Sequence, residues 1–458
     1  MTAFRRSQHN FALERAVTLA NELGKPLLVL EPLRCGYRWA SDRFHRFVIE
    51  GMRDNRTAFD RAGVHYHPWV EPEAGAGRGL VAALSEEAAA VVTDDFPCFF
   101  LPRMLDAAAE RVSGRLEAVD GNGWLPLADT NRVFARAVDF RRYLQKRLPE
   151  HLGRRPDAEP LDALRAKRAF VPDALERWPA ADLAALLASD GLASLPIDHA
   201  VAPAPIEGGS VAARRRLETF LAEDLDHYEE RNHPDDDRGS GLSPHLHFGH
   251  VSSHEIVARI LEREGFDASR LPDRATGSRE GWWGLSPAAE GFLDQVITWR
   301  ELGYQFCARR PDHAEYDALP DWARATLEDH AGDERDVVYS LEEFAAARTH
   351  DEIWNAAQRQ LREEGRIHNY LRMLWGKKIL EWTASPRDAA EVMIALNDRY
   401  ALDGRDPNSY SGIFWVLGRF DRAWGPERPI FGKIRYMSSD NTRRKVHLKR
   451  YLERWSGR

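Results

Sequence analysis

The residues best suited to chemistry lie between positions 354 and 408. Three tryptophans, Trp354, Trp375 and Trp382, stand in this stretch. Trp375 and Trp382 are seven residues apart, which is two helical turns, so they share one face of a helix. Such rings could stack on a flat ligand. The alternative is ordinary core packing, which also applies to Met373, two residues before Trp375.

A polar segment follows the tryptophans. It contains more charged and turn-forming residues than a simple connection needs: Asn397, Asp403, Arg405, Asp406 and Asn408. We interpret it as a loop that forms the wall of a pocket for a polar ligand. An ion pair between Arg372, on the preceding helix, and Asp403 could lie under that ligand.

A second candidate site is Tyr228 followed by SGLSPHLHFG at 240–249. Ser240, Gly241 and Ser243 stand where a helix would begin, and Pro244 favours its first turn. A helix start with hydroxyl groups and a glycine is suited to binding an anion. An ordinary capped helix is the alternative.

Two further stretches combine aromatic and charged residues. Trp299 and Glu301 follow the apolar segment FLDQVIT. A carboxyl group at this position is costly to bury without a partner, which indicates that Glu301 forms hydrogen bonds or transfers protons. The alternative is a surface salt bridge. Trp415 precedes a segment in which aromatic residues alternate with Arg428, Lys433 and Arg435, a pattern typical of nucleic-acid contact or of a hairpin packed on the core.

Composition indicates an ordinary globular protein. The chain has 458 residues, 43% of them hydrophobic, and a net charge of −8. No apolar run is long enough for a membrane span, and three isolated cysteines fit a reducing cytoplasm and argue against a disulfide or metal framework. From Arg428 onward ten lysines and arginines face two acids, so a basic tail follows an acidic body. This tail is either a phosphate-binding surface or a solvated helix.

The elements that must position these residues fall into three segments. Residues 1–128 alternate helical and strand-like segments, which predicts a parallel sheet in an α/β domain. Strands are expected at 25–30, 64–70, 90–93 and 116–119, and helices at 10–23, 41–62, 79–89 and 101–112. Residues 129–205 read as a connector with a helix at 131–148, and residues 206–458 as helical. No GxGxxG or Walker sequence is present, so neither classical nucleotide site is supported.

Seven motifs, in this order, are similar to the class II cyclobutane pyrimidine dimer photolyases: SGLSPHLHFG, FLDQVITWREL, ALPDWARATLEDH, THDEIWNAAQ, GRIHNYLRMLWGKKILEW, LNDRYALDGRDPNSYSG and RPIFGKIRYMS. The resemblance is dense from about residue 225 to residue 440. It implies a Rossmann-like antenna domain, an all-α domain that binds FAD, and light-driven repair of DNA. In this family reduced flavin passes an electron to a pyrimidine dimer that is flipped out of the duplex.

The resemblance also implies roles for individual residues. It assigns contacts to the FAD phosphates and ribose to Tyr228, Ser240, Gly241, Leu242 and Ser243. It places beside the flavin ring Arg372, Asp403 and Asn397, with Asp406 and Asn408 as further cofactor candidates. It gives a photoreduction chain, from proximal to distal, of Trp375, Trp354 and Trp382. It assigns contacts to the dimer to Glu301, Trp299, Trp415 and Met373. It also suggests that Arg428, Lys433 and Arg435 contact DNA.

Two departures from the family stand out. The apolar strand that normally opens the sheet is missing, because Met1 falls almost directly on the Arg-rich loop that should follow it; either residues precede Met1 or the sheet is rearranged. His245 and Asn369 replace an aromatic and a small residue. We expect a monomeric cytoplasmic enzyme with a deazaflavin-type antenna and no metal. The alternatives are a cryptochrome-like photoreceptor, an enzyme for (6-4) lesions, in which His245 and His254 would matter, and a plain helical DNA-binding module.

Overall fold

The computed structural model describes residues 1–167 and 169–457 and divides into two compact units. The first unit contains Met1–Leu127, His151–Glu218 and Gly241–Arg259. The second contains Ala128–Glu150, Thr219–Ser240 and Ile260–Arg458. These units assign most of the expected connector, 129–205, to the first unit, so the division into three segments stays a prediction.

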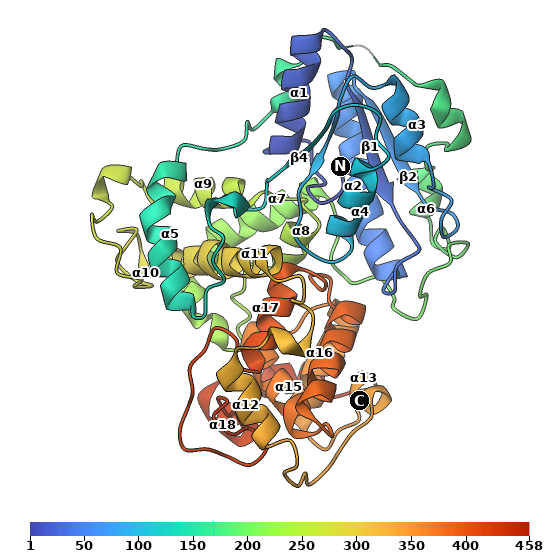
Figure 1. Ribbon diagram of the computed structural model, residues 1–458. Coiled ribbons are helices and arrows are strands. Elements are labelled where there is room, and N and C mark those ends of the chain that lie inside the picture. The colour runs from blue at the N-terminus through green and yellow to red at the C-terminus, as the bar shows by residue number, and fades with distance from the viewer. Residues whose placement is uncertain (168, 458) are drawn as a thin grey trace. The chain divides into compact units, whose positions relative to one another are not determined.

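The first unit alternates strands with helices over its N-terminal part (Figure 1). Its strands are β1 (Leu28–Leu33), β2 (His65–Val70), β3 (Val91–Asp94) and β4 (Leu116–Val119). Its helices are α1 (Phe11–Leu23), α2 (Asp42–Ala62), α3 (Leu80–Glu87), α4 (Leu101–Ala109), α6 (Leu183–Leu186) and α8 (Ser243–His247). Helices α7 (Ser210–Thr219) and α9 (Ser253–Arg263) extend to or past its borders.

The ends of α1 and α2 follow from capping residues that the sequence displays. The Asn10 side chain accepts a hydrogen bond from the Leu13 N–H, and Gly24 ends α1 in the left-handed region at φ 62°. Gly63 ends α2 in the same way at φ 70°. Both helices therefore lie within two residues of their predicted ranges.

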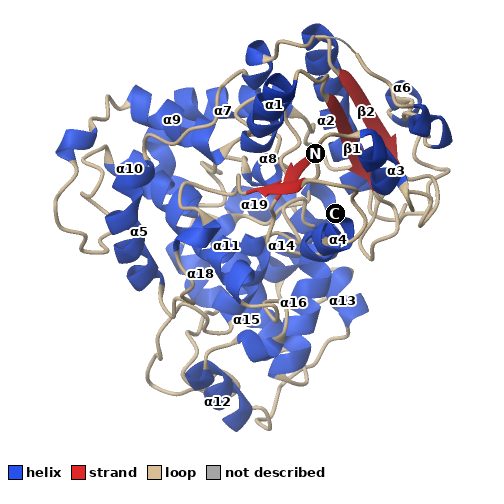
Figure 2. Cartoon of the chain, turned by 45° about the horizontal axis from the view of Figure 1, so that its top comes forward, coloured by secondary structure: helices blue, strands red, loops and turns tan. Residues whose placement is uncertain are grey.

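The strands form two separate parallel pairs (Figure 2). β1 pairs with β2, from Leu28 opposite His65 onward, and β3 pairs with β4, from Val91 opposite Leu116 onward. No strand of the described residues joins the two pairs, so the expected parallel strands are present but form two small sheets. The strand expected at 25–30 also lies three residues further on, because pairing with β2 begins only at Leu28.

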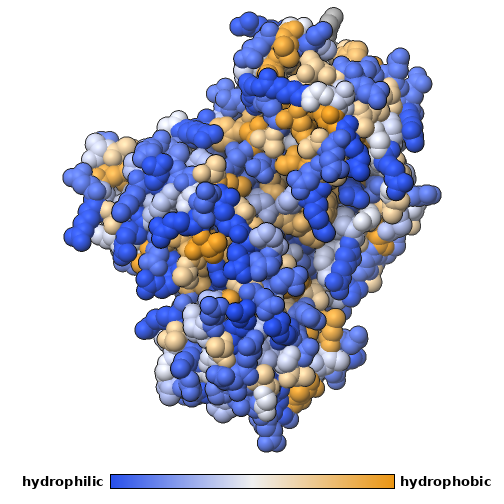
Figure 3. All heavy atoms as spheres, in the orientation of Figure 1, coloured by the Kyte–Doolittle hydropathy of each residue, from blue (hydrophilic) through white to orange (hydrophobic). Residues whose placement is uncertain are grey.

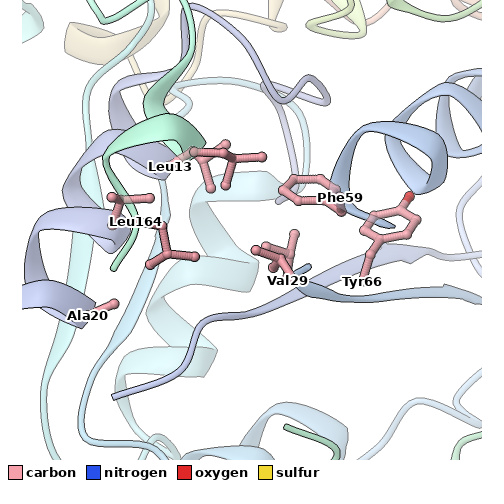
Figure 4. Packing of buried hydrophobic residues seen from close by; sticks show 9 residues of the cluster. Leu13, Ala20, Val29, Phe59, Tyr66 and Leu164 are labelled. Carbon is pink, nitrogen blue, oxygen red and sulfur yellow. The ribbon is translucent and has the colours of Figure 1, made fainter. Parts of the chain in front are cut away.

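A hydrophobic cluster holds α1 and α2 against the β1–β2 pair (Figure 4). Leu13 and Ala20 of α1 belong to the same cluster as Val29 of β1, while Phe59 of α2 stacks on Tyr66 of β2 with ring centres 5.2 Å apart. Full burial of side chains of this size contributes about 1.5–3 kcal/mol each. The cluster covers one face of a sheet that is only two strands wide.

Among the described residues of the first unit, five histidines are buried: His45, His67, His245, His250 and His254. His245 and His250 pack on the ring of Phe47, with ring centres 5.3 and 5.0 Å away. Burial lowers the pKa of His45 and of His245 to about 4, and it lowers the pKa of His250 as well. All three are therefore neutral in the folded protein near neutral pH.

We expect the protein to lose stability as the pH falls from about 6.5 towards 4. In this window the histidines of the unfolded chain, with an ordinary pKa near 6.5, bind protons, whereas the buried histidines of the folded state stay neutral. For one fully titrated group this difference lowers the free energy of unfolding by about 3 kcal/mol. The variant His245→Phe keeps an aromatic ring beside Phe47 and removes one such group. Its Tm, measured from pH 7.5 to 4.5, should fall less steeply than that of the unaltered protein.

His199 provides a control of opposite sign. Its Nδ1 lies 2.8 Å from Asp42 Oδ1, and this hydrogen bond raises its pKa, so His199 stabilises the folded state at acid pH. His199→Phe should leave the fall of Tm equally steep or make it steeper. An unchanged slope in the His245 variant would contradict the assignment of the acid sensitivity to this cluster.

The second unit is built of helices joined by loops, with no β-strand among its described residues, in agreement with the expectation for the C-terminal part. Its helices are α5 (Ala137–His151), α10 (Pro287–Leu293), α11 (Arg300–Arg309), α12 (Asp321–Asp329), α13 (Leu341–Ala345), α14 (Glu352–Glu364), α15 (Asn369–Glu381), α16 (Pro386–Tyr400), α17 (Pro407–Val416), α18 (Ser439–Lys445) and α19 (Lys449–Arg454). Two π-helical turns, η4 (Phe220–Asp224) and η7 (Asp294–Trp299), interrupt the pattern. Helix α15 packs against α14, α16 and α17 and is buried on nearly all sides.

Candidate active site

The three tryptophans of the second unit form a continuous series of rings. Trp354 of α14 is fully buried and lies parallel to Trp375 of α15, with an interplanar angle of 4° and ring centres 6.5 Å apart. Trp382, the C-cap of α15, meets Trp354 edge to face at 6.2 Å. The structure thus brings the rings together in the order Trp375, Trp354, Trp382, although their redox role stays a prediction.

Hydrogen bonds fix the orientation of the two inner rings. The indole N–H of Trp354 donates to the Trp375 carbonyl at 3.0 Å, and the indole N–H of Trp375 donates to Gln358 Oε1 at 2.9 Å. The Asp351 side chain caps α14 by accepting from the Trp354 backbone N–H. Buried, hydrogen-bonded rings of this kind have little freedom to turn, so the distances between them are constant.

Trp382 has neighbours that the sequence analysis missed. Tyr339 and His350 contact its ring at 5.8 and 4.8 Å, and the Tyr339 hydroxyl lies 2.7 Å from His350 Nδ1. The Lys378 ammonium group lies 5.2 Å from the centre of the same ring. Tyr339 and His350 stand in an irregular segment with no periodic pattern, so nothing local in the sequence points to this contact.

The expected ion pair between Arg372 and Asp403 is present. Arg372 Nη2 lies 3.5 Å from Asp403 Oδ2, and the Asp403 side chain is only 12% exposed. The other carboxylate oxygen of Asp403, Oδ1, is buried and has no hydrogen-bond partner among the described residues. An acceptor left open in a buried position is suited to a donor from a bound ligand.

Asn397 is buried on α16, which continues to Tyr400, so its expected place in the polar loop is wrong. The neighbouring Asp398, which sequence reasoning missed, is also buried near the end of this helix. Its carboxylate accepts hydrogen bonds from the Arg405 backbone N–H at 2.9 Å and from the Tyr410 hydroxyl at 3.1 Å, and so it ties the following loop to α16. Burial raises the pKa of Asp398. Arg405 itself adopts a left-handed backbone at φ 62°.

Asp406 and Asn408 form hydrogen bonds that cap the start of α17. The Asp406 side chain accepts from the backbone N–H and from Nδ2 of Asn408, at 2.8 and 2.9 Å. A Cβ atom on Gly303 of α11 would lie only 3.0 Å from Asn408 Oδ1, so α11 and α17 approach closely at this point. A role of the two residues in cofactor binding stays a prediction.

The residues expected to contact phosphate and ribose are divided between the units. Tyr228 lies in the second unit within η5 (Leu225–Asn232), where it is buried under the Arg231 guanidinium group, and burial raises its pKa to about 12. Ser240 also belongs to the second unit, whereas Gly241, Leu242 and Ser243 belong to the first. A helix does begin at Ser243, as expected, but α8 has only five residues and no side chain caps it.

Trp299 is the last residue of the π-helical turn η7, and Glu301 follows it in α11; such a turn changes the direction of the side chains relative to a regular helix. The Trp299 ring lies 5.0 Å from that of Trp415 on α17, and both rings are half-buried, like Met373. Glu301 is 2% exposed, so the surface salt bridge considered for it is wrong. A buried acid near two partly open rings is an arrangement that can receive a ligand from outside.

Arg428, Lys433 and Arg435 are exposed, as a contact with DNA requires. Lys433 is already paired with Glu427 at 3.0 Å, which reduces the charge it can offer to a phosphate. Arg435 lies 5.3 Å from the Trp424 ring centre and is not limited in this way. Arg435 is therefore the better candidate of these two.

The chain is similar along its whole length to curated proteins named deoxyribodipyrimidine photo-lyase. The protein from Methanothermobacter thermautotrophicus is 34% identical over 459 residues, covering 100% of this chain and 94% of the relative. Those from Arabidopsis thaliana and Potorous tridactylus are 32% and 31% identical, and each alignment covers 98% of this chain and 86% and 79% of the relatives. No family model matches the chain.

Solved structures show the same fold. A bacterial class III photolyase from Agrobacterium tumefaciens superposes with a TM-score of 0.69 at 17% identity, over 99% of this chain and 84% of that chain. An archaeal photolyase from Sulfolobus tokodaii gives a TM-score of 0.65 at 14% identity, over 98% and 87%. These matches confirm the predicted fold class. Within the described residues, no helix combines the length and apolar character that crossing a membrane requires.

Proposed function

Because the chain belongs to the deoxyribodipyrimidine photo-lyase family, we propose that it repairs cyclobutane pyrimidine dimers in DNA by light-driven electron transfer from reduced FAD. The observation that supports this most is the buried acid Glu301, which stands two residues after Trp299, whose ring contacts that of Trp415. A dimer that is flipped out of the duplex needs such a polar contact and flat apolar walls.

The residues of the second unit fit a flavin ring. Asp403 offers an open acceptor in Oδ1, and Arg372 offers guanidinium N–H donors beside it. Asn397 adds a buried amide from α16. Donors and acceptors of this kind match the N–H and C=O groups along the edge of the ring. When bound in its reduced form, FAD would supply the light-activated electron that opens the cyclobutane ring.

The protein residues would position the reactants and conduct electrons. Trp375, Trp354 and Trp382 would carry electrons inward during activation, since their rings are in sequential contact. Trp299, Trp415 and Met373 would form the walls around the flipped bases, and Glu301 would hydrogen-bond them. Exposed Arg428 and Arg435 would bind phosphates of the damaged strand, and the attraction would weaken as salt rises.

Three further properties are proposed from the family resemblance alone. These are contacts of Tyr228, Ser240 and the start of α8 with the FAD phosphates, an antenna of the deazaflavin type, and action as a cytoplasmic monomer. The first can be separated from the others by measuring flavin affinity in variants of Tyr228, and the second by the absorption spectrum of the purified protein after addition of the deazaflavin.

Asp403→Asn should weaken FAD binding by about tenfold to a hundredfold, because a hydrogen bond or ion pair with a charged partner contributes about 1.5–3 kcal/mol. The measurement is the dissociation constant from quenching of flavin fluorescence. Asp440→Asn, which removes an exposed acid on α18, is the control and should bind FAD normally. Equal affinities of both variants would show that Asp403 does not face the flavin.

The choice of lesion tests the proposal against its nearest alternatives. Purified, reduced protein should repair an oligonucleotide with a cyclobutane thymine dimer under blue light and leave one with a (6-4) product unchanged. Repair of the (6-4) product alone would contradict the proposed substrate. A protein that binds FAD and photoreduces it, yet repairs neither lesion, would be a photoreceptor of the cryptochrome type.

A further inference from the structure

Lys377 of α15, in the second unit, is a lysine in an unusual position. Its side chain is only 1% exposed, whereas lysines are almost never fully buried without a charged partner. Hydrophilic side chains normally lie at the surface, as they do over α12 and α16 in Figure 3. No carboxylate among the described residues accepts a hydrogen bond from the Lys377 ammonium group, so its burial needs another explanation.

The Lys377 side chain donates instead to the backbone carbonyl of Val416. Val416 is the last residue of α17, and a helix leaves the carbonyl groups of its last turn without partners inside the helix. Backbone N–H groups that follow Val416 donate to Phe414 and Trp415. Lys377 thus supplies the hydrogen bond for Val416, at a helix end where a positive charge is favoured.

Helices α15 and α17 lie close together beside this hydrogen bond. A Cβ atom on Gly376 would lie 2.8 Å from Val416 Cγ2, so the approach leaves no room for a side chain at that position. The residue before Val416 is Trp415, whose ring lies 5.0 Å from that of Trp299. Any movement of the end of α17 relative to α15 would therefore also change the contact between these two rings.

Two charged side chains that follow α17 act on the proton of Lys377. The pKa of Lys377 is lowered to about 7, mainly because burial removes the hydration of the ammonium group. The carboxylate of Asp421 opposes this shift, and the guanidinium group of Arg435 adds to it. Among the described residues, no titratable group of α14, α16 or α17 acts on this proton. The charge of Lys377 near neutral pH therefore depends on Arg435, which is exposed.

We propose that Lys377 is a positioning residue for Trp415 in the dimer pocket, and that it takes up a proton from solvent when damaged DNA binds. This role rests on the proposed function, since it requires bound DNA. A DNA phosphate that pairs with Arg435 offsets the guanidinium charge, which favours the protonated form of Lys377. The ammonium group donates a stronger hydrogen bond to Val416 than a neutral amine does, and so it fixes the end of α17.

The first test compares two duplexes of the same sequence, one with a thymine dimer and one undamaged. Dissociation constants are measured in darkness, with FAD bound, for the unaltered protein and for Lys377→Met, which keeps an unbranched side chain and removes the hydrogen bond. Affinity for the dimer duplex should fall at least about tenfold. Affinity for the undamaged duplex should stay within about twofold, because the exposed Arg428 and Arg435 are unchanged.

The second test measures proton uptake during binding of the dimer duplex, by titration calorimetry near neutral pH in two buffers of different ionisation enthalpy. The unaltered protein should take up more protons than Lys377→Met, since only the unaltered protein has an amine to protonate at this position. Arg435→Gln should lose the same part of the uptake, because the charge that DNA offsets is then absent. A purely structural role of Lys377 would change neither value.

Leu148→Ala is the control for a loss of stability. Leu148 of α5 is fully buried in the same unit, so its truncation should lower Tm. It should leave the ratio of the two dissociation constants and the proton uptake unchanged. Tm of Lys377→Met is measured alongside, so that an effect of general destabilisation is recognised by comparison with this control.

Two results would overturn the proposal. One is an equal loss of affinity for both duplexes in Lys377→Met, which would indicate general damage to the unit. The other is equal proton uptake by Lys377→Met and the unaltered protein, which would mean that the lysine does not bind a proton with DNA. Neither readout uses light, so either result leaves the test of repair intact. An unaltered protein without any preference for the dimer duplex would contradict the proposed function and this role together.

Discussion

Trp375→Phe should slow the photoreduction of bound, oxidised FAD by at least about tenfold, which corresponds to an activation free energy higher by about 1.4 kcal/mol. Phenylalanine fills most of the same space but is far harder to oxidise, so the series of rings loses its first member. Repair by protein that has been reduced chemically should be nearly unchanged, because Trp375 then has no electron to supply. The two rates are measured from flavin absorbance and from dimer loss.

Trp282→Phe is the matched control for this experiment. Trp282 is as well buried as Trp375, but it packs against Trp283, at 4.9 Å between ring centres, and not against the series. The control should photoreduce normally. Loss of both activities in Trp375→Phe would indicate a damaged flavin pocket, and normal photoreduction would show that electrons enter by another route.

Glu301→Ala should have the opposite pattern. Repair should fall by about tenfold to a hundredfold, since a hydrogen bond to a charged or polarised group contributes about 1.5–3 kcal/mol. Photoreduction of FAD should proceed at its normal rate, because none of the three tryptophans is altered. The readouts are repair per absorbed light and the rate of flavin reduction.

Burial of Glu301 makes a conservative variant necessary. Glu301→Gln keeps the volume of the side chain and a hydrogen-bonding end, and it should retain more repair than the alanine variant. Tm of both variants shows whether the fold is kept. Full repair by Glu301→Ala would mean that the carboxyl group does not contact the dimer.

The sequence predicted the elements whose ends carry local signals. Asn10 and Gly24 mark α1, Gly63 ends α2, and the strand expected at 116–119 is β4. Elements without such signals were displaced. The helix expected from 131 begins only at Ala137, because Arg136 forms a β-bridge with Phe420, a contact that no local pattern encodes.

The candidate site shows the same division. The spacing of Trp375 and Trp382 was informative, but their contact through Trp354 depends on how α14 packs against α15. Asp398 and Tyr339 were missed because their roles come from tertiary neighbours. The resemblance to class II photolyases, by contrast, rested on seven ordered motifs and is confirmed by relatives that match the whole chain.

Light dependence tests the central claim most directly. Purified protein with FAD reduced chemically is mixed with a thymine-dimer oligonucleotide, and intact thymines are counted after equal times in blue light and in darkness. We predict repair in light and none in darkness. Repair that is equal in light and darkness, or absent in light despite bound reduced FAD and bound DNA, would contradict the assignment.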